Sequence, residues 1–120
     1  MNNENELEII LDSTNKIFNK HITHELRQDI SNKNISLMKL WENIEDIGLT
    51  QIAVKEKFEG SDLSFNSILP VIQLSTKMGL PLPLTETIIC NYLFSELDIK
   101  PPKGIITFAI ETKNIKILNG

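Results

Sequence analysis

The sequence predicts a mainly α-helical protein, an up-and-down bundle of about four helices followed by a short C-terminal β-hairpin. Apolar residues recur at helical spacing through residue 99, and strand-like alternation replaces that spacing after the Pro101-Pro102 pair. A length of 120 residues fits one helical domain without a disulfide or metal staple. We therefore expect a helical domain over residues 1–99, a linker over 100–103, and a packed hairpin or the start of a β-domain over 104–120.

Two amphipathic helices are expected to open the chain. The first covers about residues 4–22, where polar residues fall between regularly spaced apolar ones. A polar loop at residues 32–34 separates it from the second helix, which Ser36 is placed to cap. Gly48 then provides the left-handed C-terminal cap of that helix. Trp41 falls on its apolar stripe, so we expect it to pack the second helix against the first and third.

Two further helices follow a loop over residues 51–63. The third helix either starts late, near Ser67, so that Pro70 lies in its first turn, or is kinked at that proline, and Gly79 ends it. Its apolar face is expected to carry Phe65, Ile68, Leu69, Ile72 and Thr76. Pro83 suits the first position of the fourth helix. The buried face of that helix is expected to consist of Leu84, Ile88, Ile89, Tyr92 and Leu93.

The end of the chain has the pattern of a β-hairpin. Residues 105–110 are rich in β-forming side chains, residues 112–114 resemble a turn, and Ile115 and Ile117 alternate with other residues. A lone hairpin is marginally stable in water. These strands are therefore expected to pack on the helices or to belong to a larger sheet.

Composition and charge exclude several classes of function. The net charge is −4, Arg27 is the single arginine and the lysines are scattered, so no basic face is present for nucleic acid or an anionic membrane. The polar, acidic N-terminus does not resemble a secretory signal, and no apolar run approaches membrane-spanning length. One cysteine, Cys90, excludes an internal disulfide and favours a reducing compartment. We expect a cytoplasmic protein.

Three local patterns, in a fixed order, point to a family. Residues 40–49 read LWENIEDIGL, residues 52–64 read IAVKEKFEGSDLS, and residues 78–87 read MGLPLPLTET. They resemble three features of the N-terminal helical domain of acyl-CoA dehydrogenases: a leucine-tryptophan helix ending in leucine-glycine-leucine, a valine-proline-glutamate-glutamate-tyrosine-glycine-glycine loop, and a proline-x-proline-leucine-x-glutamate-threonine join between long helices. The resemblance spans residues 7–110, and residues 104–110 would open the middle β-domain of that family.

Two positions depart from the family's loop. Lys55 stands where the family usually has proline, and Glu59 stands where the first of two glycines is expected. Glycine adopts a left-handed backbone without steric cost, whereas glutamate does not. A looser or differently shaped loop is therefore expected here.

The resemblance implies a flavin-dependent oxidoreductase. Enzymes of this family remove two hydrogens from an acyl-CoA thioester, with a glutamate as the general base and FAD as the hydride acceptor. The base lies in the family's C-terminal domain and most flavin contacts lie in its middle and C-terminal domains. No catalytic residue can therefore be assigned in this chain. FAD is expected only in the complete enzyme or with a partner chain, either a second polypeptide or a homo-oligomer. The alternative is a free-standing helical interaction module, derived from that family, that catalyses nothing.

The fourth helix is the element that the resemblance places against the acyl pocket. Ile88, Ile89 and Tyr92 are the candidate substrate-binding residues. The competing interpretation is that they are core residues, since most apolar residues at helical spacing are buried. An incomplete member of the family would also expose apolar surface on this helix and on the hairpin, which a partner would cover.

Other candidate reactive groups have simpler interpretations. His21 and His24 have a spacing compatible with zinc, but a zinc site needs further ligands, so a solvated helix end is expected. Cys90 follows two isoleucines, which favours a buried, inert thiol over a nucleophile. The acidic residues 45–46 are interpreted as a solvated face, and Glu86 as a favourable charge at a helix start.

Overall fold

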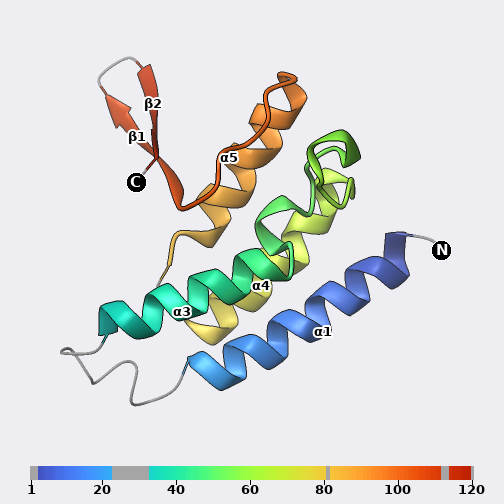
Figure 1. The fold of residues 1–120 in the computed structure, drawn as a ribbon, viewed down its shortest axis with the longest axis vertical. Coiled ribbons are helices and arrows are strands. Elements are labelled where there is room, and N and C mark those ends of the chain that lie inside the picture. The colour runs from blue at the N-terminus through green and yellow to red at the C-terminus, as the bar shows by residue number, and fades with distance from the viewer. Residues whose placement is uncertain (1–2, 23–32, 81, 112–113, 120) are drawn as a thin grey trace.

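Four α-helices and one β-hairpin make up most of the described structure. The computed structural model describes residues 3–22, 33–80, 82–111 and 114–119. In chain order, the main elements are α1 (Asn3–His21), α3 (Lys33–Asp46), α4 (Ile68–Met78), α5 (Leu84–Glu96), β1 (Ile106–Glu111) and β2 (Asn114–Asn119) (Figure 1). The strands pair antiparallel, from Ile106 opposite Asn119 to Glu111 opposite Asn114. The predicted fold class, a helical bundle followed by a hairpin, is confirmed.

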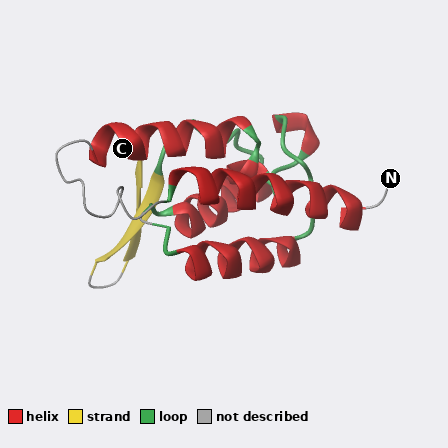
Figure 2. Cartoon of the chain, turned by 90° about the horizontal axis from the view of Figure 1, so that it is seen from below, coloured by secondary structure: helices red, strands yellow, loops and turns green. Residues whose placement is uncertain are grey.

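The helices run in alternating directions, and the hairpin lies at one end of them (Figures 1 and 2). Helix α1 contacts both α3 and α4, and α4 contacts α5. The molecule extends 43 × 40 × 21 Å. Since a helix with its side chains is about 10–12 Å across, the shortest dimension corresponds to two helix layers.

The core lies between these helices. Its centre contains the fully buried side chains of Phe18, Leu40, Ile44, Val71 and Ile88. Trp41 is also buried, as its position on the apolar stripe predicts. Each such side chain contributes about 1.5–3 kcal/mol through removal from water, so the core dominates the stability of the domain.

The helix ends follow most of the sequence signals. Gly48 and Gly79 both adopt the left-handed conformation, with φ values of 79° and 66°, as predicted for C-terminal caps. Helix α4 begins at Ile68, preceded by a 3₁₀ turn, so Pro70 lies in its first turn. The predicted loop at residues 33–34 is wrong, because α3 already begins at Lys33, which places Ser36 inside the helix rather than at its N-cap position. Lysine and asparagine are tolerated in helices, so polar composition alone did not mark the boundary.

The connection between α3 and α4 is part of the core. Leu49, Ile52, Val54 and Leu63 are buried in it, and it contains the 3₁₀ turns η1 (Leu49–Gln51) and η2 (Glu56–Phe58). Buried side chains and a set of backbone hydrogen bonds give residues 49–63 a defined shape. We call this segment the 49–63 loop.

The 49–63 loop does not need glycine at position 59. Glu59 itself adopts a left-handed backbone, with φ at 67°, so the expectation that glutamate would prevent this conformation is wrong. Gly60 is the position where only glycine fits. A Cβ atom there would lie 2.2 Å from the carbonyl oxygen of Val54. The close approach of these two backbone segments therefore fixes the turn.

Candidate functional site

Helix α5 carries a stripe of buried polar side chains. Thr87, Asn91 and Ser95 recur every four residues and are 0%, 2% and 0% exposed. Side chains with this spacing share one face of a helix. Leu84 and Ile88 are buried as predicted, but Leu93 is 46% exposed, so its predicted place on the buried face is wrong. The helix thus turns small polar side chains inward.

The C-terminal part of the stripe, Asn91 and Ser95, holds the 49–63 loop. The Asn91 side-chain amide donates a hydrogen bond to the Thr50 carbonyl oxygen at 3.0 Å. The Lys55 backbone N–H donates to the Ser95 hydroxyl at 2.9 Å. An irregular segment buried against a helix would leave backbone groups unpaired, and these two side chains supply partners for them. This need explains why polar residues occupy the inner face of α5.

The N-terminal end of the stripe, Thr87, holds the hairpin. The Ile106 N–H donates to Thr87 Oγ1 at 3.1 Å, and the Thr87 hydroxyl lies 2.8 Å from the Ile106 carbonyl oxygen. The same hydroxyl lies 3.0 Å from the Pro83 carbonyl oxygen, so its single proton is shared between two acceptors. Next to this contact, the Glu86 carboxylate accepts a hydrogen bond from the Thr107 hydroxyl. Thr87 and Glu86 therefore fix the start of β1 on the first turn of α5.

Exposed apolar side chains lie at the C-terminal end of α5, with Leu93 on the helix and Leu97 and Ile99 directly after it. Leu93, Leu97 and Ile99 are 46%, 71% and 48% exposed, and we call them the outer apolar face. On β2, Ile117 and Leu118 are 44% and 42% exposed. Apolar surface on the fourth helix and on the hairpin is what an incomplete member of the acyl-CoA dehydrogenase family predicts. Ile9, Met38 and Leu69 on the other helices are exposed as well, so the covering partner stays a prediction.

Helix α4 is rotated relative to the predicted apolar face. Phe65 and Leu69 are 45% and 54% exposed, whereas the buried residues of this helix are Ile68, Val71 and Ser75. The ring of Phe65 packs on Tyr92 of α5, with the ring centroids 4.8 Å apart. Phe65 belongs to the 3₁₀ turn before α4, so this contact joins that turn to the surface of α5.

The three candidate substrate-binding residues occupy different environments. Ile88 is 1% exposed and belongs to the hydrophobic core. Ile89 and Tyr92 are half-buried at the surface of α5, and Tyr92 contacts Phe65. These positions leave Ile89 and Tyr92 accessible to a ligand or partner. Their binding role stays a prediction.

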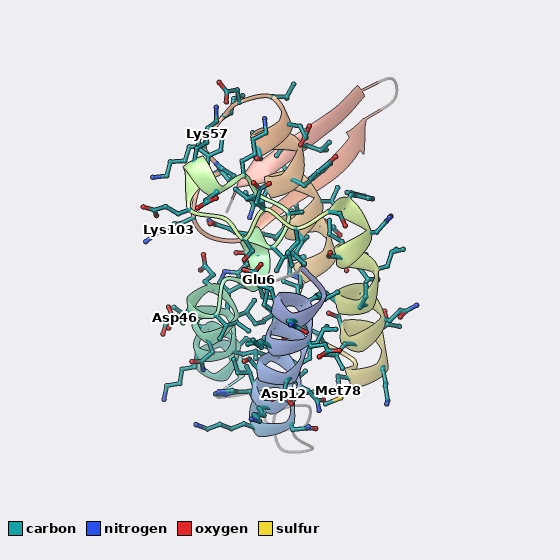
Figure 3. The ribbon with its side chains drawn as sticks, turned by 90° about the vertical axis from the view of Figure 1, so that its right-hand side faces the viewer. Glu6, Asp12, Asp46, Lys57, Met78 and Lys103 are labelled. Atoms are coloured by element: carbon teal, nitrogen blue, oxygen red, sulfur yellow. The ribbon has the colours of Figure 1, made fainter. Side chains whose placement is uncertain are left out.

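Two surface hollows lie near α3. One, of about 450 Å³, is lined by the apolar residues Leu37, Met38, Trp41, Leu82 and Ile105 together with Glu42. The other, of about 380 Å³, has acidic walls from Glu42, Glu45, Asp46 and Glu59, and Lys103 also lines it. Figure 3 shows Asp46 and Lys103 on the same side of the molecule. Neither hollow is lined by Ile88, Ile89 or Tyr92.

FAD does not fit the hollows that these residues form. Its pyrophosphate is anionic and binds where backbone N–H groups or cationic side chains converge. The acidic hollow would repel it, and the apolar hollow offers a carboxylate, Glu42, rather than a cation. The buried Trp41 Nε1 has no partner among the described residues, but it is closed off from solvent and so cannot reach a phosphate in the hollow.

The other titratable groups of interest are structural. The Asn43 side-chain amide donates to His21 Nε2 at 2.9 Å, so His21 joins α1 to α3 rather than lying at a fully solvated helix end. Partial burial, and then the charges of Lys20 and Lys39, hold the pKa of His21 below its usual value of 6.5. Across the described ranges, no cluster of three or more His, Cys, Asp or Glu residues is placed to hold a metal ion. His24 lies outside the described residues.

Cys90 is buried, as predicted. Burial raises the pKa of its thiol, and the nearby Glu86 carboxylate raises it further. A protonated, enclosed thiol is a poor nucleophile. Cys90 therefore acts as a small apolar side chain on α5.

Comparison with known proteins finds no protein-family model, no curated protein and no solved structure that matches the chain. None of the helices in the described part of the chain combines the length and apolar character needed to cross a membrane.

Proposed function

We propose that this chain is the N-terminal domain, or a split subunit, of a flavin-dependent acyl-CoA dehydrogenase. In that role it covers one side of the pocket for the acyl chain. The proposal is supported by the three ordered sequence patterns and by the agreement between the family's helical domain and the bundle followed by a hairpin. The α,β-dehydrogenation itself would take place on groups that the remaining domains supply.

The observation that carries the proposal is the exposed apolar surface at the C-terminal end of α5. A surface helix of a free-standing domain turns its apolar side to the core and its polar side to water. Here Leu84 and Ile88 share the inner face of α5 with the polar stripe, while the outer apolar face is left in water. Full burial of a leucine or isoleucine side chain contributes about 1.5–3 kcal/mol. Covering this face by another polypeptide would therefore be strongly favourable.

The partner in this proposal carries the flavin and the catalytic base. The two hollows described near α3 do not fit FAD, so we assign the cofactor site to the covering polypeptide and derive no catalytic step from the residues present. The contribution of this chain is an apolar wall. Ile89 and Tyr92, which are half-buried on α5, are the proposed contacts to the acyl chain, and Ile88 supports them from the core.

Purification from the native host tests the proposal. A tagged copy of the chain should be isolated gently and its visible spectrum recorded. We expect flavin absorbance together with a second polypeptide. Leu97→Gln should reduce the recovered flavin, because it places an amide in the outer apolar face. Glu96→Gln, at the neighbouring exposed position, should leave it unchanged.

A colourless chain recovered alone would contradict the proposal and favour the free-standing interaction module. Equal flavin recovery with Leu97→Gln and Glu96→Gln would show that the partner does not dock on the outer apolar face.

A further inference from the structure

The two hollows near α3 adjoin one another. Glu42 lines both of them, so its side chain stands on the boundary between the apolar hollow and the acidic one. The segment that precedes β1 borders both as well, because Ile105 lines the apolar hollow and Lys103 lines the acidic one. Between these two residues, the Gly104 N–H donates to the Glu45 carboxylate at 3.2 Å, which holds the segment against α3. We call the two hollows together the α3 groove.

The α3 groove changes from apolar to acidic along the helix. Met38, Glu42 and Asp46 are spaced four residues apart, so they share one face of α3. Met38 is 65% exposed and lies in the apolar part of the groove with Trp41. The acidic part is lined by four carboxylates and by one ammonium group, that of Lys103. An apolar wall that leads to a surplus of negative charge is complementary to a ligand with an apolar body and a cationic end.

The acidic part of the groove lies at the end of α3 where negative charge is least favourable. The aligned peptide dipoles of a helix place about half a negative charge at its C-terminus, which favours Lys, Arg or His in the last turn. The last turn of α3 contains none of these and ends in Glu45 and Asp46 instead. The carboxylates therefore add to the dipole rather than oppose it. A bound cation would relieve this repulsion.

The carboxylates of the groove are too dispersed for one metal ion. Within the described ranges, no three His, Cys, Asp or Glu residues come together closely enough to hold one, and Ca²⁺ or Mg²⁺ needs oxygen ligands at about 2.0–2.6 Å. An organic cation needs no such shell, because its head pairs with one carboxylate while its body packs on apolar side chains. The two parts of the groove, of about 450 and 380 Å³, have the size of small-molecule sites, about 300–1,000 Å³.

We propose that the α3 groove binds a small amphiphilic amine, whose apolar alkyl or aryl body packs on Trp41 and Met38 and whose ammonium group faces Glu42. The ring of a tryptophan provides a large apolar contact, and the flexible thioether of a methionine adapts to irregular shapes. The inference does not rest on the proposed function. The groove is formed by residues of this chain, and neither Ile89 nor Tyr92 lines it.

The fluorescence of Trp41 reports on the groove directly, because Trp41 is the single tryptophan of the chain. The full-length chain should be titrated with decylamine, decanoate and spermidine, each below the concentration at which micelles form. Decanoate reverses the charge of the head, and spermidine carries positive charge without a long apolar body. We expect a saturable change with decylamine, and binding of the other two that is at least about tenfold weaker.

Two glutamine variants with the same net charge test the role of Glu42. Glu8 is exposed on α1 and lines neither hollow, so Glu8→Gln is the matched control for Glu42→Gln. We expect Glu42→Gln to weaken the binding of decylamine by at least about threefold, and Glu8→Gln to weaken it by less than about twofold. Met38→Lys changes an exposed side chain and places an ammonium group in the apolar part. This variant should bind decanoate more tightly than decylamine.

Three results would overturn the proposal. They are equal affinity of the wild-type chain for decylamine and decanoate, equal weakening of decylamine binding by the two glutamine variants, and the lack of any saturable fluorescence change. None of them bears on the proposed function, because these titrations contain no flavin-carrying polypeptide.

Discussion

Replacing Thr87 by valine tests whether one hydroxyl joins the hairpin to the helical bundle. Valine has nearly the same shape, so the substitution removes hydrogen bonds without opening a cavity. The Ile106 N–H and C=O would lose their partner in a site where both residues are 0% exposed. Each unpaired buried group costs about 1–3 kcal/mol, or about 4 kcal/mol for the two.

The added apolar surface of valine offsets part of this loss, by about 1 kcal/mol. We therefore expect Thr87→Val to lower the free energy of unfolding by about 3 kcal/mol, a large part of the roughly 5–15 kcal/mol that stabilises a typical domain. Urea unfolding followed by circular dichroism measures this change as a lower midpoint at an unchanged slope.

Thr87→Ser is the matched control, because it keeps the hydroxyl and removes a buried methyl group. Its expected cost is about 1 kcal/mol. The reasoning would be refuted if the serine variant were as destabilised as the valine variant, since the hydroxyl would then contribute nothing that the methyl group does not.

Three other predictions concern the 49–63 loop and His21. Gly60→Ala should destabilise the fold by about 3 kcal/mol in urea titrations, because the new Cβ atom would lie 2.2 Å from the Val54 carbonyl oxygen; near wild-type stability would contradict this close approach. Glu59→Gly should stabilise it by about 0.5 kcal/mol, since relief of left-handed strain slightly exceeds the entropy cost of glycine, and a loss of stability would count against that strain. The lowered pKa of His21 means that the unfolded chain binds the proton more readily. Its contribution to stability is therefore fully present above about pH 6.5 and is lost as the pH falls through the folded pKa. His21→Gln should flatten the pH dependence of the unfolding midpoint in this range, and an unchanged slope would argue against it.

The sequence was sufficient for the features that depend on local patterns. The caps at Gly48 and Gly79 were predictable because a left-handed residue after a helix favours glycine, and both adopt positive φ. The late start of α4 followed from the restriction that Pro70 places on a helix interior. The hairpin followed from the change of period after the proline pair.

The inner face of α5 was not predictable from local patterns. Apolar periodicity placed Leu93 on the buried face, whereas the structure buries Asn91 beside it. The partner of Asn91 is the Thr50 carbonyl, 41 positions away in the sequence. No pattern within one helix can report that an irregular segment packs on it and needs hydrogen-bond donors. The binding roles of Ile89 and Tyr92 depend on the family resemblance and stay predictions.

The central claim is that this chain works as part of a flavin-dependent acyl-CoA dehydrogenase. The most direct measurement is an anaerobic titration, with acyl-CoA thioesters of short to long chain length, of the material isolated with the tagged chain from its native host. Loss of the oxidised flavin absorbance on addition of one of these thioesters is the predicted result, because the substrate would transfer hydride to the cofactor. Isolated material without flavin, or a flavin spectrum that no acyl-CoA changes, would contradict the claim.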